Sequence, residues 1–279
     1  MFHDYADLHI HSIYSDSSLS LENVFQEAKN AGLKCISLTD HDTIRGIKDA
    51  RMISVSYGIE LISGIEFSAQ HGDREVHILG YMIDDDSKKI NDVVSELKMV
   101  RMDRIRKMSL KLSSLGLKIE KDDLDNIIKD AVPTRLHLAL CMVKKGYSNS
   151  IRDAFKKYLS YGKPAYVSRF RYSVKESIGI LKKSKGVVFL AHPHLLPIKE
   201  WIHDFVDWGI DGIEVMYPGY SPEVTDKFSK IASRYNLLKS GGSDSHGIYK
   251  DFTAIGNTRI PYEWVRKIKD KHSKLFVYE

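Results

Sequence analysis

The sequence predicts an α/β protein in which about seven strands approach a closed barrel, with a helical segment inserted between the two halves of the barrel. Strand-like and helix-like segments alternate over residues 1–87 and again over residues 164–279, whereas residues 88–163 contain no strand-like segment. Strands that alternate with helices of about ten to fifteen residues are typical of parallel βα units. We therefore expect a barrel built from residues 1–87 and 164–279, and a helical domain over residues 88–163.

The first half of the barrel opens with a short apolar run at residues 5–10. A helical pattern follows over residues 20–31, with Ser20 positioned to cap its first turn and Gly32 positioned to end it. The other expected elements are a strand at 34–38, a helix at 43–57, and strands at 59–67 and 75–81. Because the last two strands are neighbours in the chain and the second alternates with period two, we expect them to pair.

The inserted segment is predicted to be helical throughout. Apolar residues from Ile90 to Leu115 recur at spacings of three and four, which predicts one long amphipathic helix over residues 89–115. Shorter helices are expected over residues 121–129, 134–144 and 150–159.

The insertion is also the basic part of the chain. Residues 88–163 hold 18 lysines and arginines against 9 aspartates and glutamates, whereas the remainder holds 24 against 28. Two interpretations remain open. The basic residues of the long helix are either a solvated face or part of a lid over an anionic substrate. These residues are Lys98, Arg101, Arg104, Arg106, Lys107 and Lys111.

The alternation resumes in the last part of the chain. Helices are expected over residues 174–183, 199–208 and 222–235, and buried strands over residues 186–191, 210–216 and 237–240. With the four strands of the first half, these complete about seven strands.

Composition excludes several classes of protein. The chain of 279 residues is 43% hydrophobic and 10% aromatic, without a long polar low-complexity stretch, which excludes intrinsic disorder. No apolar run approaches the roughly 18 residues that a membrane helix needs, and the first residues do not resemble a secretory signal. Cys35 and Cys141 lie in apolar surroundings and cannot form a disulfide framework. We therefore expect a cytoplasmic protein that needs neither a membrane nor an obligate protein partner.

Histidine and carboxylate residues gather at the ends of the predicted strands. His9 and His11 are two residues apart, which places both side chains on one face of an extended segment. Comparable residues lie at or near the ends of the later strands: Asp40, His41, Glu66, His77, His192, Asp244 and His246. A single such residue is more often a satisfied polar group, and Asp40 could simply cap the following helix.

The recurrence of these residues favours a shared site. The carboxyl ends of parallel strands meet at one rim of a barrel, where active sites form. Imidazole and carboxylate groups bind divalent ions such as Zn²⁺, Mn²⁺ and Fe²⁺. Because there are too many ligands for one tetrahedral ion, we expect two or three ions, with Glu66 as a bridge.

Four short motifs make the sequence similar to the PHP (polymerase and histidinol phosphatase) family. They are His9-Ile10-His11, Thr39-Asp40-His41, Ala191-His192-Pro193 and Gly242-Ser243-Asp244-Ser245-His246. The resemblance implies a distorted seven-stranded (β/α) barrel, similar to a TIM barrel, that holds three metal ions. Manganese is the ion we expect, with zinc or iron as alternatives.

The resemblance also implies a set of ligands for each ion. One ion would bind His9, His11, Glu66 and Asp244, a second Glu66, His77 and His192, and a third Asp16, His41 and His246. Asp40 and Asp42 would not bind an ion themselves but would hold neighbouring ligands in the right orientation. No catalytic residue is expected beyond the ligands, because a metal-activated hydroxide would attack the phosphorus atom.

The insertion resembles one branch of this family. The motifs are Thr134-Arg135-Leu136-His137-Leu138-Ala139 and Gly162-Lys163-Pro164-Ala165-Tyr166-Val167. That branch contains nucleoside 3′,5′-bisphosphate phosphatases and 5′-to-3′ exoribonucleases of the ribonuclease AM type. It implies hydrolysis of a nucleotide or short RNA at a phosphate on a ribose 3′-oxygen. The expected substrate-binding residues are Arg135, His137, Lys163 and Arg169. His137 could instead pack in the protein interior, because one face of its helix is apolar.

Three other functions remain as alternatives. A histidinol phosphatase would use the same chemistry on a small cationic substrate, which the basic insertion disfavours. A metal-dependent amidohydrolase would need a strand-end lysine suited to bridging two ions, and none is apparent. A non-catalytic interaction module would be expected to lack some of the ligands, whereas all nine positions are filled here. Glu214 and His194 have no assigned role.

Overall fold

The computed structural model of the chain describes residues 4–168, 171–251 and 253–276, and its strands form one sheet. The strands are β1 (Tyr5–Ile10), β2 (Cys35–Leu38), β3 (Glu60–His71), β4 (Arg74–Tyr81), β5 (Val187–Leu190), β6 (Gly212–Met216), β7 (Leu238–Gly241) and β8 (Ile260–Pro261). Their order in the sheet is β7-β6-β5-β4-β3-β2-β1-β8.

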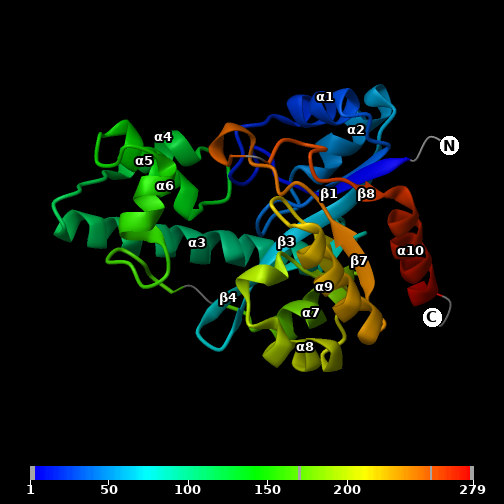
Figure 1. Cartoon of the computed structure of the whole chain (residues 1–279). Helices are drawn as coiled ribbons and strands as arrows, with labels where there is room; N and C mark the ends of the chain where they lie inside the picture. The colour runs from blue at the N-terminus through cyan, green and yellow to red at the C-terminus, as the bar shows by residue number, and fades with distance from the viewer. Residues whose placement is uncertain (1–3, 169–170, 252, 277–279) are drawn as a thin grey trace.

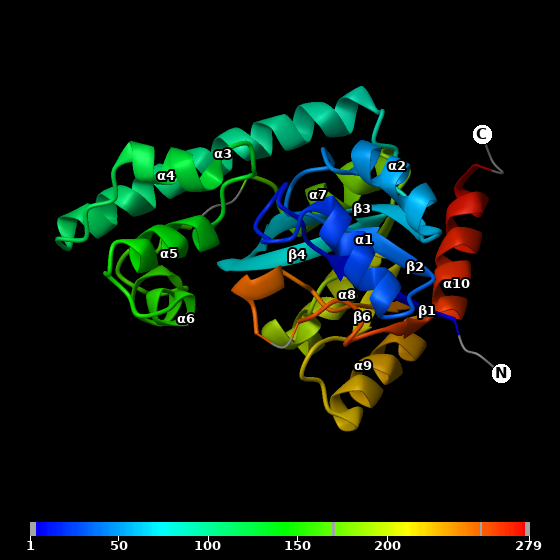
Figure 2. The ribbon, with the colours of Figure 1, turned by 90° about the horizontal axis from the view of Figure 1, so that it is seen from above.

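Helices accompany the sheet and extend beyond it. Those that alternate with the strands are α1 (Leu21–Asn30), α2 (Ile47–Tyr57), α7 (Val174–Lys183), α8 (Ile198–Asp207), α9 (Pro222–Arg234) and α10 (Tyr262–Ser273). Those between β4 and α7 are α3 (Lys88–Ser114), α4 (Lys121–Ile128), α5 (Arg135–Lys144) and α6 (Ile151–Ala154), which continues into a π-helical turn, η1 (Phe155–Leu159). In both views α4, α5 and α6 lie to one side of the sheet, and α3 extends from the sheet to them (Figures 1 and 2).

The strand count and the strand directions differ from those predicted. The sheet contains eight strands rather than seven, because β8 pairs antiparallel with β1. A strand of two residues is too short to leave a periodic pattern in the sequence. β4 pairs antiparallel with both β3 and β5, so the predicted pairing of its segment with the preceding strand is confirmed. The other neighbouring pairs among β1 to β7 are parallel.

The sheet curls until its two ends nearly meet. The chain leaving β7 runs beside the end of β1, where Ser245 forms an isolated parallel bridge with Ile10. The His11 backbone N–H donates to the Ser245 carbonyl oxygen at 3.0 Å. Gly242 permits this approach, because a Cβ atom there would lie 2.4 Å from the His9 nitrogen. The result is a nearly closed barrel.

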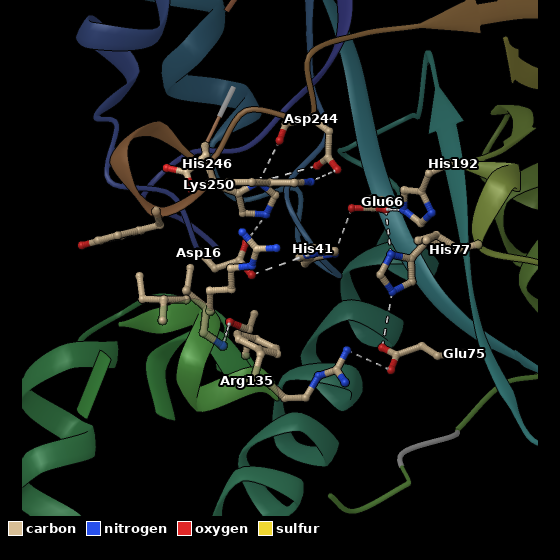
Figure 3. Close-up of a pocket in the computed structure, with 18 of the residues that line it drawn as sticks. Asp16, His41, Glu66, Glu75, His77, Arg135, His192, Asp244, His246 and Lys250 are labelled. Atoms are coloured by element: carbon tan, nitrogen blue, oxygen red, sulfur yellow. Dashed lines mark hydrogen bonds and ion pairs between the residues drawn. The ribbon is translucent and has the colours of Figure 1, made fainter. Parts of the chain in front are cut away.

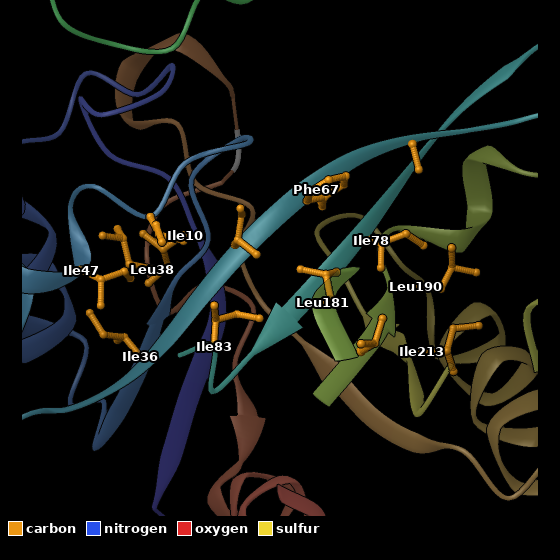
Figure 4. Packing of buried hydrophobic residues seen from close by; sticks show 14 of the residues in the cluster. Ile10, Ile36, Leu38, Ile47, Phe67, Ile78, Ile83, Leu181, Leu190 and Ile213 are labelled. Carbon is orange, nitrogen blue, oxygen red and sulfur yellow. The ribbon is translucent and has the colours of Figure 1, made fainter. Parts of the chain in front are cut away.

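Three hydrophobic clusters stabilise the described part of the molecule, and one of them, which includes Leu8, Phe189 and Val265, joins the strands to α10. The largest one packs the strands against their helices and includes Ile10, Phe67 and Ile213 (Figure 4). A second cluster, which includes Met108 and Leu138, lies within residues 105–165. The inserted helices therefore have a core of their own. Within the described residues, no helix is both long enough and apolar enough to cross a lipid bilayer.

Candidate metal centre

The structure brings the nine predicted ligands together at one rim of the barrel. His9 and His11 lie at the end of β1, Asp16 in the loop after it, and His41 just after β2. Glu66 and His77 lie within β3 and β4, His192 follows β5, and Asp244 and His246 follow β7. Their side chains point toward one another, as Figure 3 shows for most of them.

Two of these residues reach the rim in an unexpected way. β3 does not end at the rim but continues to His71 as one arm of a long hairpin, so Glu66 lies in the middle of its strand. β4 runs back antiparallel, and His77 therefore lies opposite Ser68, two residues beyond Glu66. The rule that ligands follow the carboxyl ends of strands is wrong for this hairpin, although its residues still face the same site.

Within the part of the chain that the structure describes, candidate ligand atoms fall into three overlapping groups, each with its atoms within 4.8 Å of one another. The groups are His9, His11, Glu66 and Asp244; His11, Asp16, His41 and His246; and His41, Glu66 and His77. The first is the set expected for one ion. The others differ from the expected sets because His11 and His41 each face two groups. His192 is absent from these groups, although its Nε2 atom lies 2.8 Å from Glu66 Oε1.

Glu66 is the centre of this arrangement, since both of its oxygens face imidazole nitrogens. Oε2 lies 3.4 Å from His9 Nε2, 3.2 Å from His11 Nε2 and 3.0 Å from His41 Nδ1. Oε1 lies 2.8 Å from both His77 Nδ1 and His192 Nε2. A carboxylate that is 1% exposed and faces several imidazoles is well suited to bridge cations.

Asp16 and Asp244 complete the acidic part of the cluster. Asp244 Oδ1 lies 3.2 Å from His11 Nε2 and 3.5 Å from His9 Nε2. Asp16 lies 3.4 Å from His246 Nε2 and 3.8 Å from His41 Nε2. The other oxygen of Asp244 accepts from the Tyr217 hydroxyl at 2.6 Å and contacts the Lys250 ammonium.

Several buried atoms of the cluster have no hydrogen-bond partner within the described residues. They are His9 Nε2, His11 Nδ1 and Nε2, Asp16 Oδ1, His41 Nδ1 and Glu66 Oε2. Buried polar atoms nearly always have a hydrogen-bond partner in folded proteins. A buried atom without one therefore calls for another partner, such as a bound ion. Because every atom in this set is a metal-ligating type, the residues fit divalent cations.

Neighbouring charges lower the pKa values of the three carboxyl groups and so favour the ionised form that binds cations. Burial alone would raise the pKa of the Glu66 carboxyl, but the imidazoles of His41 and His77 outweigh it and hold that pKa well below its usual value. The pKa values of Asp16 and Asp244 are also held below their usual values against burial, that of Asp16 mainly by the imidazoles of His41 and His246 and that of Asp244 mainly by the Lys250 ammonium. Conversely, the carboxylates overcome burial and raise the pKa of His11 to about 9. A cation must therefore displace protons from such imidazoles when it binds.

The backbone is strained at several of these positions. Asp42, His192 and Asp244 have φ angles of 50°, 26° and 48°, in a region that residues other than glycine rarely adopt. Such conformations persist where surrounding contacts impose them, and they concentrate at functional sites.

Asp40 supports the cluster, but not as a helix cap. α2 begins only at Ile47, so the alternative that Asp40 caps it is wrong. Its carboxylate instead accepts from the Ser12 backbone N–H at 2.7 Å, and from the hydroxyls of Ser12 and Ser15 at 2.7 and 2.5 Å. These bonds hold the loop that carries Asp16.

Glu214 on β6 is a supporting residue whose role the sequence did not indicate. One carboxylate oxygen lies 2.9 Å from His9 Nδ1, and the other accepts from the His192 backbone N–H at 2.6 Å. The first contact turns His9 Nε2 toward Glu66 and Asp244. The only signal in the sequence is a glutamate within an otherwise apolar strand.

Glu214→Gln is expected to weaken metal affinity by about 10- to 100-fold, the usual cost of losing a partner behind a ligand. Competition with a chromophoric chelator measures this affinity. Glu223→Gln, at the exposed start of α9, is the matched control and should bind metal as the wild type does. Wild-type affinity in Glu214→Gln would show that this carboxylate does not orient His9.

Asp42 joins the rim of the barrel to α3. Its carboxylate accepts from the Ser68 backbone N–H at 2.7 Å and from Arg101 Nε at 2.6 Å. Arg101 also donates to the Ser68 hydroxyl at 2.8 Å. The interpretation of α3 as carrying a solvated basic face holds for Arg106. It is wrong for Arg101 and Arg104, which are each 5% exposed.

A cavity of about 700 Å³ opens above the cluster. One wall belongs to the barrel, and the other belongs to the inserted helices (Figure 3). The helical wall carries four arginines: Arg101, Arg104, Arg135 and Arg152. Glu75 lies between two of them, 3.4 Å from Arg104 Nη2 and 3.5 Å from Arg135 Nη2.

The predicted substrate-binding residues do not all reach this cavity. Arg135 lines it, with its guanidinium stacked near Phe155 and Tyr166. His137 does not, because its Nδ1 atom accepts from the Thr134 backbone N–H at 3.0 Å within the first turn of α5. Lys163 is exposed and does not line the cavity either. Arg169 lies outside the described residues.

Comparison with known proteins agrees with the motifs and the geometry. A model of the PHP domain matches residues 7–196. A 5′-3′ exoribonuclease from Haemophilus influenzae is 32% identical over 245 residues, which cover 86% of this chain and 89% of that protein. A 3′,5′-nucleoside bisphosphate phosphatase from Chromobacterium violaceum is 31% identical over 261 residues, which cover 90% of each. The solved structure of a proposed metal-dependent phosphoesterase from Bifidobacterium adolescentis matches with a TM-score of 0.89 and 29% identity, covering 95% of this chain and 96% of that chain.

Proposed function

Because the chain belongs to the PHP domain family, we propose that it is a metal-dependent phosphoesterase that cleaves nucleotide phosphate esters at a ribose 3′-oxygen. Its substrates would be nucleoside 3′,5′-bisphosphates and short RNA with a 5′-phosphate. The observation that carries this proposal is the pocket itself. Imidazoles and carboxylates form its floor, and four arginines line the helical wall. The names of the exoribonuclease and bisphosphate phosphatase relatives support the same substrates.

The nine ligands named above would hold two or three divalent ions, with manganese expected and zinc or iron as alternatives. When bound, these ions would supply a water molecule of lowered pKa and neutralise charge on the phosphoryl oxygens. Glu66 would hold neighbouring ions at a fixed separation. Glu214 and Asp40 would keep the ligands oriented, so that little reorganisation is needed when the substrate arrives.

The inserted helices, residues 88–163, would act as the substrate-binding lid. Arg135 is 25% exposed in the pocket and can present two parallel N–H donors to a phosphate. We assign it the 5′-phosphate of the substrate. Arg101 and Arg104 add positive charge behind it while remaining paired with Asp42 and Glu75. The four arginines that line the cavity also disfavour a cationic substrate such as histidinol phosphate.

An assay with three substrates tests this proposal. Adenosine 3′,5′-bisphosphate, histidinol phosphate and a 5′-phosphorylated RNA are each supplied with Mn²⁺, and cleavage is measured before and after chelation. We expect cleavage of both nucleotide substrates, little reaction with histidinol phosphate, and loss of all activity on chelation. Cleavage of histidinol phosphate alone, or of neither nucleotide, would overturn the substrate assignment.

A further inference from the structure

A set of aromatic side chains leads from the metal cluster to the protein surface. Tyr217, at the end of β6, donates its hydroxyl to Asp244 Oδ2, and its ring lies 5.8 Å from that of His192. On its other side the Tyr217 ring lies 5.0 Å from His194 and 5.5 Å from Tyr220. We call His194, Tyr217 and Tyr220 the aromatic platform.

His194 is the outermost ring of the platform, and it is exposed and yet fixed in orientation. His194 Nδ1 lies 2.8 Å from the Tyr220 hydroxyl oxygen, and the two rings meet edge to face at 87°. Tyr220 is itself held by stacking on Phe228, with ring centroids 5.4 Å apart. An exposed ring held in place loses little conformational freedom when it binds a ligand. The neighbouring Leu195, 61% exposed, extends this apolar surface to the cavity.

Tyr217 lines the barrel wall of the cavity and Arg135 lines the helical wall, whereas His194 and Tyr220 lie outside the lining, next to the Tyr217 ring. Under the proposed function, on which this inference rests, Arg135 takes the 5′-phosphate and the metal cluster takes the phosphate on the 3′-oxygen. Hydrolysis breaks the bond between phosphorus and that 3′-oxygen, which gains a proton, while the water oxygen joins the phosphorus. In RNA the same phosphorus also carries a second nucleotide, which leaves with the phosphate as its own 5′-phosphate.

We propose that the aromatic platform stacks the base of this second nucleotide. Every base offers a flat π-face, and stacking on aromatic side chains, histidine included, is a common way to bind single-stranded RNA without reading its sequence. The second nucleotide is joined to the phosphate that the cations held by Glu66 and Asp244 would bind, and Tyr217 of the platform donates its hydroxyl to Asp244. The protein is therefore built to favour short RNA over a mononucleotide bisphosphate.

Three substrates and four proteins test this inference. The substrates are adenosine 3′,5′-bisphosphate, the 5′-phosphorylated dinucleotide pApA, and the same dinucleotide with its second base removed. One cleavage releases one AMP from the first and third substrates and two from pApA, so rates are compared per bond cleaved. The wild type should cleave pApA with a kcat/KM about tenfold above that of the abasic dinucleotide, the size of one base stack. His194→Ala should abolish this ratio, and His194→Phe, which keeps a flat ring, should retain most of it.

His203→Ala is the matched control. His203 forms a similar pair with Tyr235 on the outer helices, with its Nε2 atom 3.0 Å from the tyrosine hydroxyl, and neither of these two residues lines the cavity. His194, by contrast, contacts Tyr217, which does line it. Its removal should leave the ratio at the wild-type value. The stacking role of the platform is refuted if the wild type cleaves all three substrates with the same kcat/KM for pApA and the abasic dinucleotide. It is also refuted if His194→Ala keeps the wild-type ratio. In both cases the proposed function stands. If no substrate is cleaved, the proposed function fails and the platform with it.

Discussion

Glu66→Gln is expected to abolish tight metal binding and to lower phosphoesterase activity by more than about 100-fold. Loss of a residue that only supports a ligand lowers activity by up to about 100-fold, and Glu66 is itself a ligand. The substitution preserves shape but removes the charge that five imidazoles face. Without it, two of the three ligand groups lose their shared carboxylate. Metal content after gel filtration and kcat/KM on adenosine 3′,5′-bisphosphate are the measurements.

A control for this variant lies on the same strand. Glu60 begins β3 at the opposite end of the barrel, where it pairs with Lys269 and accepts from the Tyr262 hydroxyl. Glu60→Gln should keep the wild-type metal content and activity. A Glu66→Gln protein that binds the full complement of ions and stays active would refute the bridging role of Glu66.

The second large effect concerns stability. Arg101→Met is expected to lower the free energy of unfolding by about 3 to 5 kcal/mol, the usual cost of breaking a buried ion pair. The variant leaves the Asp42 carboxylate, 0% exposed, without the guanidinium that faces it. Urea denaturation of metal-free protein measures this cost without a contribution from bound ions.

Two further variants make this result specific. Lys107→Met, six residues further along the same helix, removes an exposed pair with Asp103 and should leave the free energy of unfolding unchanged within error. Asp42→Asn combined with Arg101→Met should recover part of the loss, because the buried negative charge that Arg101 faces is then also removed. If Arg101→Met unfolds like the wild type, the ion pair does not fasten α3 to the barrel.

The elements of the barrel were predictable wherever the chain repeats a simple pattern. The spacing of His9 and His11 on an apolar strand indicates two side chains on one face without any knowledge of the fold. The long helix α3 follows from apolar residues at spacings of three and four. By contrast β8, with two residues, carries no periodic signal, and the antiparallel course of β4 depends on the turn that precedes it.

The supporting residues of the site were harder to predict because their partners are distant in the sequence. Glu214 contacts His9 across 205 positions, and Arg101 contacts Asp42 across 59. On a helix with many basic residues, nothing local distinguishes the buried Arg101 and Arg104 from their exposed neighbours. The motif around His137 also suggested a phosphate ligand. His137 lies three residues after Thr134, however, and its side chain accepts from the Thr134 backbone N–H in the first turn of α5.

The proposed activity depends most on cations being held by the histidines and carboxylates at the barrel rim. The most direct test is the metal content of the purified protein, measured together with its hydrolysis of adenosine 3′,5′-bisphosphate before chelation, after it and after return of Mn²⁺. We predict two or three ions per chain, loss of hydrolysis when they are removed, and recovery when Mn²⁺ is restored. Undiminished hydrolysis by protein that holds no ions would contradict the account.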